Sequence, residues 1–169
     1  MLSYDDFLKN DTLIIESCTG TGKTSAISKH IKQYIKTEPT TKIISLITRK
    51  TLEPQHQKNF KEHDINLISY LDDERNIETD HIIICINSLY QYQHIEPNEL
   101  KNSILLIDET ASFTNALTHN ETINGERKII YSVINKLINN CKKIICLDAH
   151  INSSVFELIE SRKQQNKLF

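Results

Sequence analysis

A glycine-containing turn between an apolar run and a helical pattern constrains this chain more than any other segment. The apolar run is Thr12–Glu16, and apolar side chains recur at helical spacing from Ile27 to Ile35. Gly20 and Gly22 lie between them and are followed directly by Lys and Thr. Glycines let a turn point its backbone N–H groups inward, and the N-terminus of the next helix adds a dipole that favours an anion. A strand, a glycine turn, Lys-Thr and a helix in this order therefore predict a loop that binds phosphate groups.

This loop predicts a nucleoside triphosphate and a magnesium ion as ligands. Lys23 would reach the β- and γ-phosphates, and the hydroxyl of Thr24 would ligate Mg²⁺. The residues expected to bind the nucleotide are Ser17, Cys18, Thr19, Gly20, Thr21, Gly22, Lys23 and Thr24. The alternative is a strand-to-helix turn that uses its glycines for shape alone, but Gly-Lys-Thr in this context favours nucleotide binding.

Short isoleucine-rich runs alternate with helical patterns along the chain. The expected buried strands are Leu13–Glu16, Lys42–Ile47, His81–Ile86, Ser103–Ile107 and Lys143–Leu147, with a weaker one at Ile65–Ser69. The expected helices are Lys23–Lys36, Leu52–His63, Ser88–Tyr92, Glu126–Asn140 and a closing helix at Ser153–Gln165. This alternation predicts an α/β fold in three layers, with a mostly parallel central sheet and right-handed crossovers. The length of 169 residues predicts a single domain that spans residues 1–169.

Composition argues against several classes of protein. Apolar residues make up 38% of the chain, which is too many for a disordered protein. The formal net charge of −2 argues against a generally basic nucleic-acid coat protein, although a local basic patch needs only a few Lys or Arg. No apolar run approaches the roughly 18 residues of a membrane-spanning helix, no signal peptide is evident, and the cysteines match no zinc spacing. We expect a soluble intracellular protein with no membrane partner.

The residues that follow each predicted strand are informative, because ligands of parallel α/β sheets bind at the carboxyl ends of the strands. Asp108 and Glu109 follow Ser103–Ile107. An acidic pair in this place is typical of a Walker B element, in which Asp108 would hold Mg²⁺ through its water shell and Glu109 would orient the attacking water. We therefore expect Lys23, Asp108 and Glu109 to be the catalytic residues. The alternative is a solvated acidic turn that caps the next helix.

Another strand end also carries polar residues. Asp148 and His150 follow Lys143–Leu147 and are expected to face the γ-phosphate or the acidic pair. His150 would then hydrogen-bond to one of the two acidic side chains and report the state of the nucleotide. The alternative is that Asp148 or Asn152 caps the next helix.

Two further strand ends predict contacts with a nucleic-acid backbone. The candidate residues are Thr48, Arg49, Lys50, Asn87 and Ser88. Cations, hydroxyls and amides at a helix N-terminus suit phosphate groups, and the nearby Tyr90 and Tyr92 could stack on a base. The alternatives are ordinary surface charge with Thr51 as a helix cap, and tyrosines that pack under the sheet.

These segments, in this order, resemble the first motor domain of superfamily 2 helicases, and most closely the replication origin-binding protein helicases of herpesviruses and related large DNA viruses. The motifs that carry the resemblance are Glu16–Thr24, Thr48–Leu52, Cys85–Leu89, Leu106–Glu109 and Leu147–His150. Ser17 stands where the full phosphate-loop pattern has its first glycine, as in many helicases and in contrast to most small-molecule kinases. Ala111 stands where DEAD and DEAH proteins have their last acidic or histidine residue.

The resemblance implies a RecA-like ATP-binding domain, with ATP as the nucleotide and DNA, single-stranded or at an origin, as the partner. It implies the DNA-dependent ATPase half of a replication helicase, found in a host cytoplasm or nucleus if the source is viral. The other half would be a second motor domain, encoded by the same gene, by the other part of a split gene, or by the gene of a partner protein. Replication proteins are further candidate partners. The alternatives are a helicase half that regulates a partner without catalysis, and a kinase or other phosphate-loop NTPase that acts on a small molecule.

Overall fold

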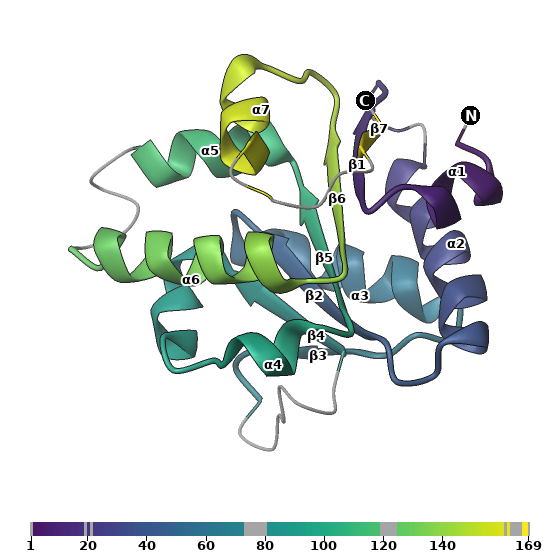
Figure 1. The fold of residues 1–169 in the computed structure, drawn as a ribbon, viewed down its shortest axis with the longest axis horizontal. Helices are drawn as coiled ribbons and strands as arrows, with labels where there is room; N and C mark the ends of the chain where they lie inside the picture. Colours follow the sequence, from purple (N-terminus) through teal and green to yellow (C-terminus); the bar gives the residue numbers. More distant parts are fainter. Residues whose placement is uncertain are drawn as a thin grey trace.

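The computed structural model describes residues 2–18, 20, 22–72, 81–118, 125–160, 162 and 167–168. Its centre is a seven-stranded sheet with the order β3-β4-β2-β5-β6-β1-β7, in which the paired strands run parallel (Figure 1). The strands are β1 (Thr12–Glu16), β2 (Lys42–Ile47), β3 (Leu67–Ser69), β4 (His81–Cys85), β5 (Ser103–Asp108), β6 (Lys143–Asp148) and β7 (Lys167–Leu168). The predicted parallel α/β sheet is confirmed, and β7 is an additional edge strand.

Helices cover both faces of the sheet (Figure 1). The helical elements are α1 (Tyr4–Lys9), α2 (Lys23–Thr37), η1 (Lys50–Leu52), α3 (Glu53–Lys61), η2 (Ile86–Tyr92), α4 (Pro97–Leu100), α5 (Thr110–Thr118), α6 (Arg127–Asn140) and α7 (Ser153–Glu160), of which η1 and η2 are 3-10 helices. The chain crosses from β1 to β2 in one direction along the sheet and from β5 to β6 in the other. Because parallel crossovers are right-handed, α2 and α6 lie on opposite faces.

Burial on both faces explains why these strands are rich in isoleucine. The side chains of β4 and β5 are buried almost throughout, and Ile83 and Ile107 are fully inaccessible to solvent. β-branched side chains fit such doubly covered strands, which read as continuous apolar runs. The apolar stripe of α6, from Ile130 to Ile138, packs against the sheet as its helical spacing predicts.

Several boundaries differ from those that the sequence predicts. Within the stretch 52–63 the α-helix covers only Glu53–Lys61, with Leu52 in the 3-10 helix η1, and the stretch 88–92 is part of the 3-10 helix η2. The closing helix ends at Glu160, and most of its expected remainder lies outside the described residues. α1, α4 and α5 were not expected, because they are too short or too polar for a clear helical period. No helix among the described residues has the length and apolarity that crossing a bilayer requires.

The strand register brings the polar strand ends to one edge of the sheet. Glu16 pairs with Asp148 at the end of β1 and β6, and Asp108 pairs with Leu147 at the end of β5 and β6. The backbone N–H of Ser17 donates to the carbonyl of Asp148 at 3.0 Å and continues this pairing into the glycine turn. The sheet therefore holds the glycine turn beside two acidic strand ends.

Candidate functional site

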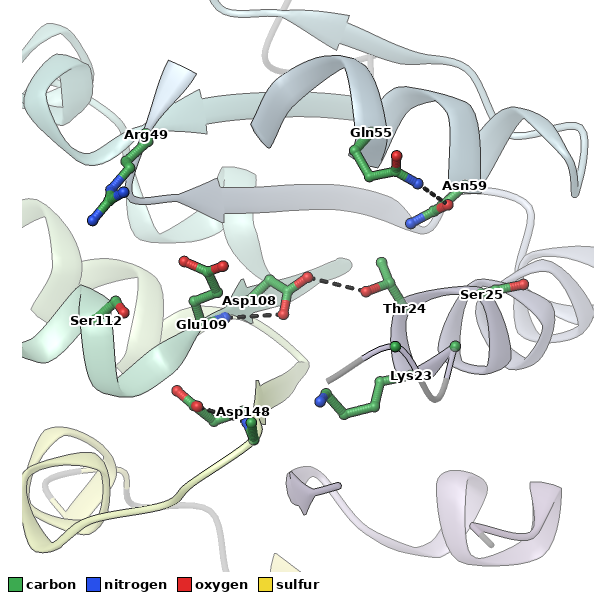
Figure 2. Close-up of a pocket in the computed structure, with 13 residues that line it drawn as sticks. Lys23, Thr24, Ser25, Arg49, Gln55, Asn59, Asp108, Glu109, Ser112 and Asp148 are labelled. Atoms are coloured by element: carbon green, nitrogen blue, oxygen red, sulfur yellow. Dashed lines mark hydrogen bonds between the residues drawn. The ribbon is translucent and has the colours of Figure 1, made fainter. Parts of the chain in front are cut away.

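A cavity of about 690 Å³ opens at this edge of the sheet (Figure 2). Its walls come from segments that are far apart in the sequence: Gly20, Gly22, Lys23, Thr24, Ser25, Arg49, Gln55, Asn59, Asp108, Glu109, Ser112, Asp148 and Ala149. Figure 2 shows Lys23 and Thr24 at the start of α2, facing the acidic residues that end β5 and β6. Predicted residues from the glycine turn, the acidic pair and the Asp148 segment thus share one cavity.

The glycine turn has the backbone conformation that its two glycines permit. Gly20 and Gly22 have φ angles of 77° and 74°, in the left-handed region that L side chains rarely adopt. Gly22 is the N-cap of α2, and its carbonyl accepts from the N–H of Ala26 at 2.8 Å. Thr19 and Thr21, which were also predicted to bind the nucleotide, lie outside the described residues. The described part of the turn leads directly into a helix N-terminus, which attracts anions.

Lys23 and Thr24 contact different walls of the cavity: Lys23 contacts the glycine turn and Thr24 contacts the end of β5. The Lys23 ammonium donates to the carbonyl oxygens of Ser17 and Cys18, the latter at 3.1 Å, so its charge is held inside the curve of the turn. The Thr24 hydroxyl donates to Oδ2 of Asp108 at 3.0 Å, although the two residues are 84 positions apart in the chain. A hydroxyl and a carboxylate at this separation form a pair of hard oxygen ligands that suits Mg²⁺.

The Asp108 carboxylate has polar contacts with three residues, two of them on different helices. Its Oδ2 accepts from Thr24 and lies 2.9 Å from Nε2 of His56, and its Oδ1 accepts from the backbone N–H of Glu109 at 2.9 Å. Burial alone would raise the pKa of this carboxyl, but the imidazole of His56 and the other donors outweigh it and hold the pKa below its usual value. Asp108 is therefore ionised near neutral pH, as a metal ligand must be.

Glu109 occupies a strained backbone position beside this carboxylate. Its φ is 50°, one of two positive values among the described residues other than glycine. Such a conformation costs energy for a residue with a Cβ, and it is commonly retained at functional sites. The carbonyl of Glu109 accepts from the N–H of Phe113 at 2.9 Å, while its side chain is exposed and lines the cavity. The turn thus presents a carboxylate at the cavity wall.

Asp148 connects the end of β6 to the start of α5. Its Oδ2 accepts from the N–H of Ala111 at 2.6 Å, and its Oδ1 accepts from the N–H groups of Ala149 and His150. Asp148 therefore caps α5, whereas the helix after it in the chain, α7, is capped by Asn152 through the N–H of Val155 at 3.3 Å. Asn152 therefore caps the next helix, as the capping alternative predicts, while Asp148 caps α5 instead.

The expected hydrogen bond from His150 to the acidic pair is wrong in this structure. The His150 side chain is 89% exposed, and its Nδ1 lies 3.6 Å from Oε1 of Glu16. The strand register accounts for the difference, because it pairs Glu16 with Asp148 and so brings the following residues over β1. The contact that the sequence assigned to His150 is made instead by His56, for which the sequence gave no signal. Gln55 and Asn59, on the same helix as His56, are cavity residues that were likewise missed.

The nucleic-acid candidates divide into exposed and buried residues. Arg49, Lys50 and Asn87 are exposed; Arg49 lines the cavity, and the Lys50 ammonium lies 5.9 Å from the centre of the Tyr70 ring. Thr48 and Ser88 are 9% and 8% exposed, and the hydroxyl oxygen of Thr48 is shielded from solvent. Tyr92 is also buried, as the packing alternative predicts, whereas Tyr90 is 40% exposed.

Comparisons with known proteins assign the family. The model of the origin of replication binding protein family matches residues 8–168. A protein of Acanthamoeba polyphaga mimivirus that is described as a replication origin-binding protein is 30% identical over 158 residues, covering 86% of this chain. The chain spans 19% of the length of that relative.

Two solved structures of other proteins have the same fold. A DEAD box protein of Methanococcus jannaschii superposes with a TM-score of 0.64 at 13% identity, over 93% of this chain and 44% of its own. Dbp5 of S. cerevisiae, bound to RNA and ADP BeF3, superposes with a TM-score of 0.61 at 17% identity, over 95% of this chain and 41% of its own. The predicted three-layer RecA-like fold is thereby confirmed. The chain belongs to the family of origin of replication binding proteins.

Proposed function

We propose that this chain is the ATP-binding, DNA-dependent ATPase domain of a replication helicase. The observation that carries the proposal is the 3.0 Å hydrogen bond between Thr24 and Asp108, which joins the glycine turn to the acidic strand end inside the cavity. A turn that used its glycines for shape alone would not need an ionised carboxylate against the first turn of its helix. The fold, shared with Dbp5, which was solved with RNA and ADP BeF3, supports the same interpretation.

The chain's own residues have distinct parts in the proposed reaction. Lys23 exchanges its contacts with the turn carbonyls for contacts with the β- and γ-phosphates. Thr24 and Asp108 would hold Mg²⁺, which neutralises phosphate charge when it is bound. Glu109 orients the attacking water and accepts its proton, a role that its exposed carboxylate at the cavity wall permits.

Nucleic acid would lie along the exposed side of η1 and η2. Arg49, Lys50 and Asn87 are exposed at the ends of β2 and β4, and cations and amides of this kind contact phosphates without reading sequence. The superposed Dbp5 was solved with RNA, which supports a nucleic-acid partner for this fold. DNA is the partner that membership in a family of origin-binding proteins favours.

A second motor domain would complete the enzyme. An arginine placed across the γ-phosphate is worth roughly 10³- to 10⁵-fold in rate. Arg49 is the one arginine among the described lining residues of the cavity, and we assign it to nucleic acid. Unwinding also needs two domains that open and close on the strand with each nucleotide. We therefore expect the chain alone to hydrolyse ATP below about 1 s⁻¹ and to unwind nothing.

Measuring ATP hydrolysis with and without single-stranded DNA tests the proposal. Slow hydrolysis that DNA stimulates is the expected result, and addition of a second motor domain should raise the rate further. Transfer of phosphate to a small acceptor would instead indicate a kinase. Tight ATP binding with no turnover under any of these conditions would indicate a helicase half that regulates a partner without catalysis.

A further inference from the structure

His56 is a buried imidazole to which the proposed reaction gives no part. It lies on α3 and is 3% exposed, and both of its ring nitrogens face polar side chains. Nε2 lies 2.9 Å from Oδ2 of Asp108, and Nδ1 lies 3.3 Å from the hydroxyl oxygen of Ser45 on β2. The imidazole therefore connects β2 to the end of β5 through the helix that covers them.

The partners of this ring determine where its hydrogen lies. An ionised carboxylate only accepts hydrogen bonds, so Nε2 carries a hydrogen and donates it to Asp108. The Ser45 hydroxyl can serve Nδ1 in either protonation state, because a hydroxyl both donates and accepts. Each polar atom of the buried ring thus has a partner, and the ring orientation is fixed at both ends.

The carboxylate that receives this hydrogen bond is the one that we assign to the cation. Oδ2 of Asp108 accepts from His56 and Thr24 together, so the contact acts on the oxygen that faces the first turn of α2. A carboxylate that ligates a metal is commonly held by outer partners, which fix its orientation and its charge. His56 lies on a packed helix and not on a loop, and a hydrogen-bond partner on a helix restricts the movement of a carboxylate more than one on a loop does.

We propose that His56 is the positioning residue for Asp108, holding its carboxylate ready for the divalent cation that enters with the nucleotide. This inference rests on the proposed function, because it presumes a Mg-nucleotide in the cavity. The simpler alternative is a core histidine whose polar atoms are merely satisfied. The two differ in what a substitution changes: a core histidine affects the stability of the fold, whereas a positioning residue affects the gain in nucleotide affinity that Mg²⁺ provides.

The test is the ratio of nucleotide affinity in Mg²⁺ to that in EDTA, measured with a fluorescent ADP analogue. His56→Leu removes both polar contacts, His56→Asn is too short to reach Asp108, and His56→Gln can still offer an N–H at the position of Nε2. Phe60→Leu is the control, because Phe60 is a fully buried residue of the same helix outside the contacts of Asp108. Circular dichroism finds a temperature at which each variant is folded, and His56→Asn carries the test if His56→Leu does not fold.

Loss of an outer partner of a metal ligand typically weakens metal binding by roughly 10- to 100-fold. We expect the affinity ratio to fall by about that factor in His56→Leu and His56→Asn, with His56→Gln and Phe60→Leu close to the parent. An unchanged ratio in both His56→Leu and His56→Asn would overturn the positioning role and leave the proposed function standing. A parent chain that binds no nucleotide, or binds it equally in EDTA, would overturn the proposed function and this inference with it.

Discussion

Replacing Gly22 by Ala distinguishes a turn that binds phosphate from a turn that needs its glycines only for its backbone conformation. Gly22 has a φ of 74°, and a Cβ built there meets no described atom within 4 Å. The substitution therefore creates no clash, and its cost to the fold comes from the left-handed backbone alone, at about 1–2 kcal/mol. For a chain of this size that corresponds to a fall in melting temperature of roughly 2–8 °C.

Gly125 provides a matched control for this stability loss. It has a φ of 86° and equally open surroundings among the described atoms, and it precedes α6 outside the lining of the cavity. Gly125→Ala should therefore destabilise the fold about as much as Gly22→Ala. Only Gly22→Ala should weaken nucleotide binding, because its Cβ or a compensating backbone rotation disturbs the N–H groups that face the phosphates.

The expected loss of affinity follows from one charge-assisted hydrogen bond between a backbone N–H and a phosphate. Such a bond contributes about 1.5–3 kcal/mol, which corresponds to roughly a 10- to 150-fold change in affinity. Titration with a fluorescent ATP analogue in Mg²⁺, at a temperature where all three proteins are folded, measures this change. Equal affinity in the parent, Gly22→Ala and Gly125→Ala would show that the glycines serve the shape of the turn only, and would refute the reasoning.

Three further predictions concern turnover, nucleic acid and pH. Glu109→Gln should lower ATP hydrolysis while Mg-nucleotide binding survives, since an amide cannot accept a proton as a carboxylate does; an unchanged rate would remove Glu109 from the mechanism. Arg49→Ala and Lys50→Ala should each make the negative slope of log affinity for single-stranded DNA against log salt concentration less steep by about 0.7. If both variants keep the slope of the parent, these cations do not contact DNA phosphates. Burial lowers the pKa of Lys143 to about 8, whereas the unfolded chain keeps this proton up to about 10.4. Between these values the unfolded state binds more protons at this lysine, so Lys143 contributes a rise in the free energy of unfolding with pH, while the buried thiols of Cys141 and Cys146, whose pKa burial raises to about 12, contribute a fall. The free energy of unfolding of the parent minus that of Lys143→Met, measured by urea titration, should therefore rise with pH between about 8 and about 10.4.

The strands and the glycine turn could be predicted because local pattern determines them. Ser103–Ile107 and Lys143–Leu147 are continuous apolar runs, and only a strand buried on both faces suits such short runs between helices. The acidic pair and Asp148 follow from those strands, since the carboxyl ends of parallel strands meet at one edge of the sheet.

Contacts across the fold account for what the sequence did not predict. α5 begins where the Thr110 hydroxyl donates to the carbonyls of Ile107 and Leu147, a bridge between two strands that no helical period reveals. His56 reaches Asp108 across 52 positions because α3 places its ring between Ser45 of β2 and the end of β5, and no sequence spacing indicates so distant a contact. His150 was assigned the role of His56 because it follows a motif, whereas burial and register decide which imidazole meets the carboxylate.

Nucleotide affinity in Mg²⁺, compared between the parent, Lys23→Ala and Lys29→Ala, tests the central claim most directly. Lys29 is an exposed lysine of the same helix, outside the lining of the cavity, so the two variants match in charge and in helix propensity. The account predicts that Lys23→Ala binds ATP roughly 10- to 150-fold more weakly, because one charge-assisted contact to the phosphates is lost. It predicts that Lys29→Ala binds like the parent. Equal affinity in all three proteins would contradict the account, since the turn that carries Lys23 would then have no part in binding a nucleotide.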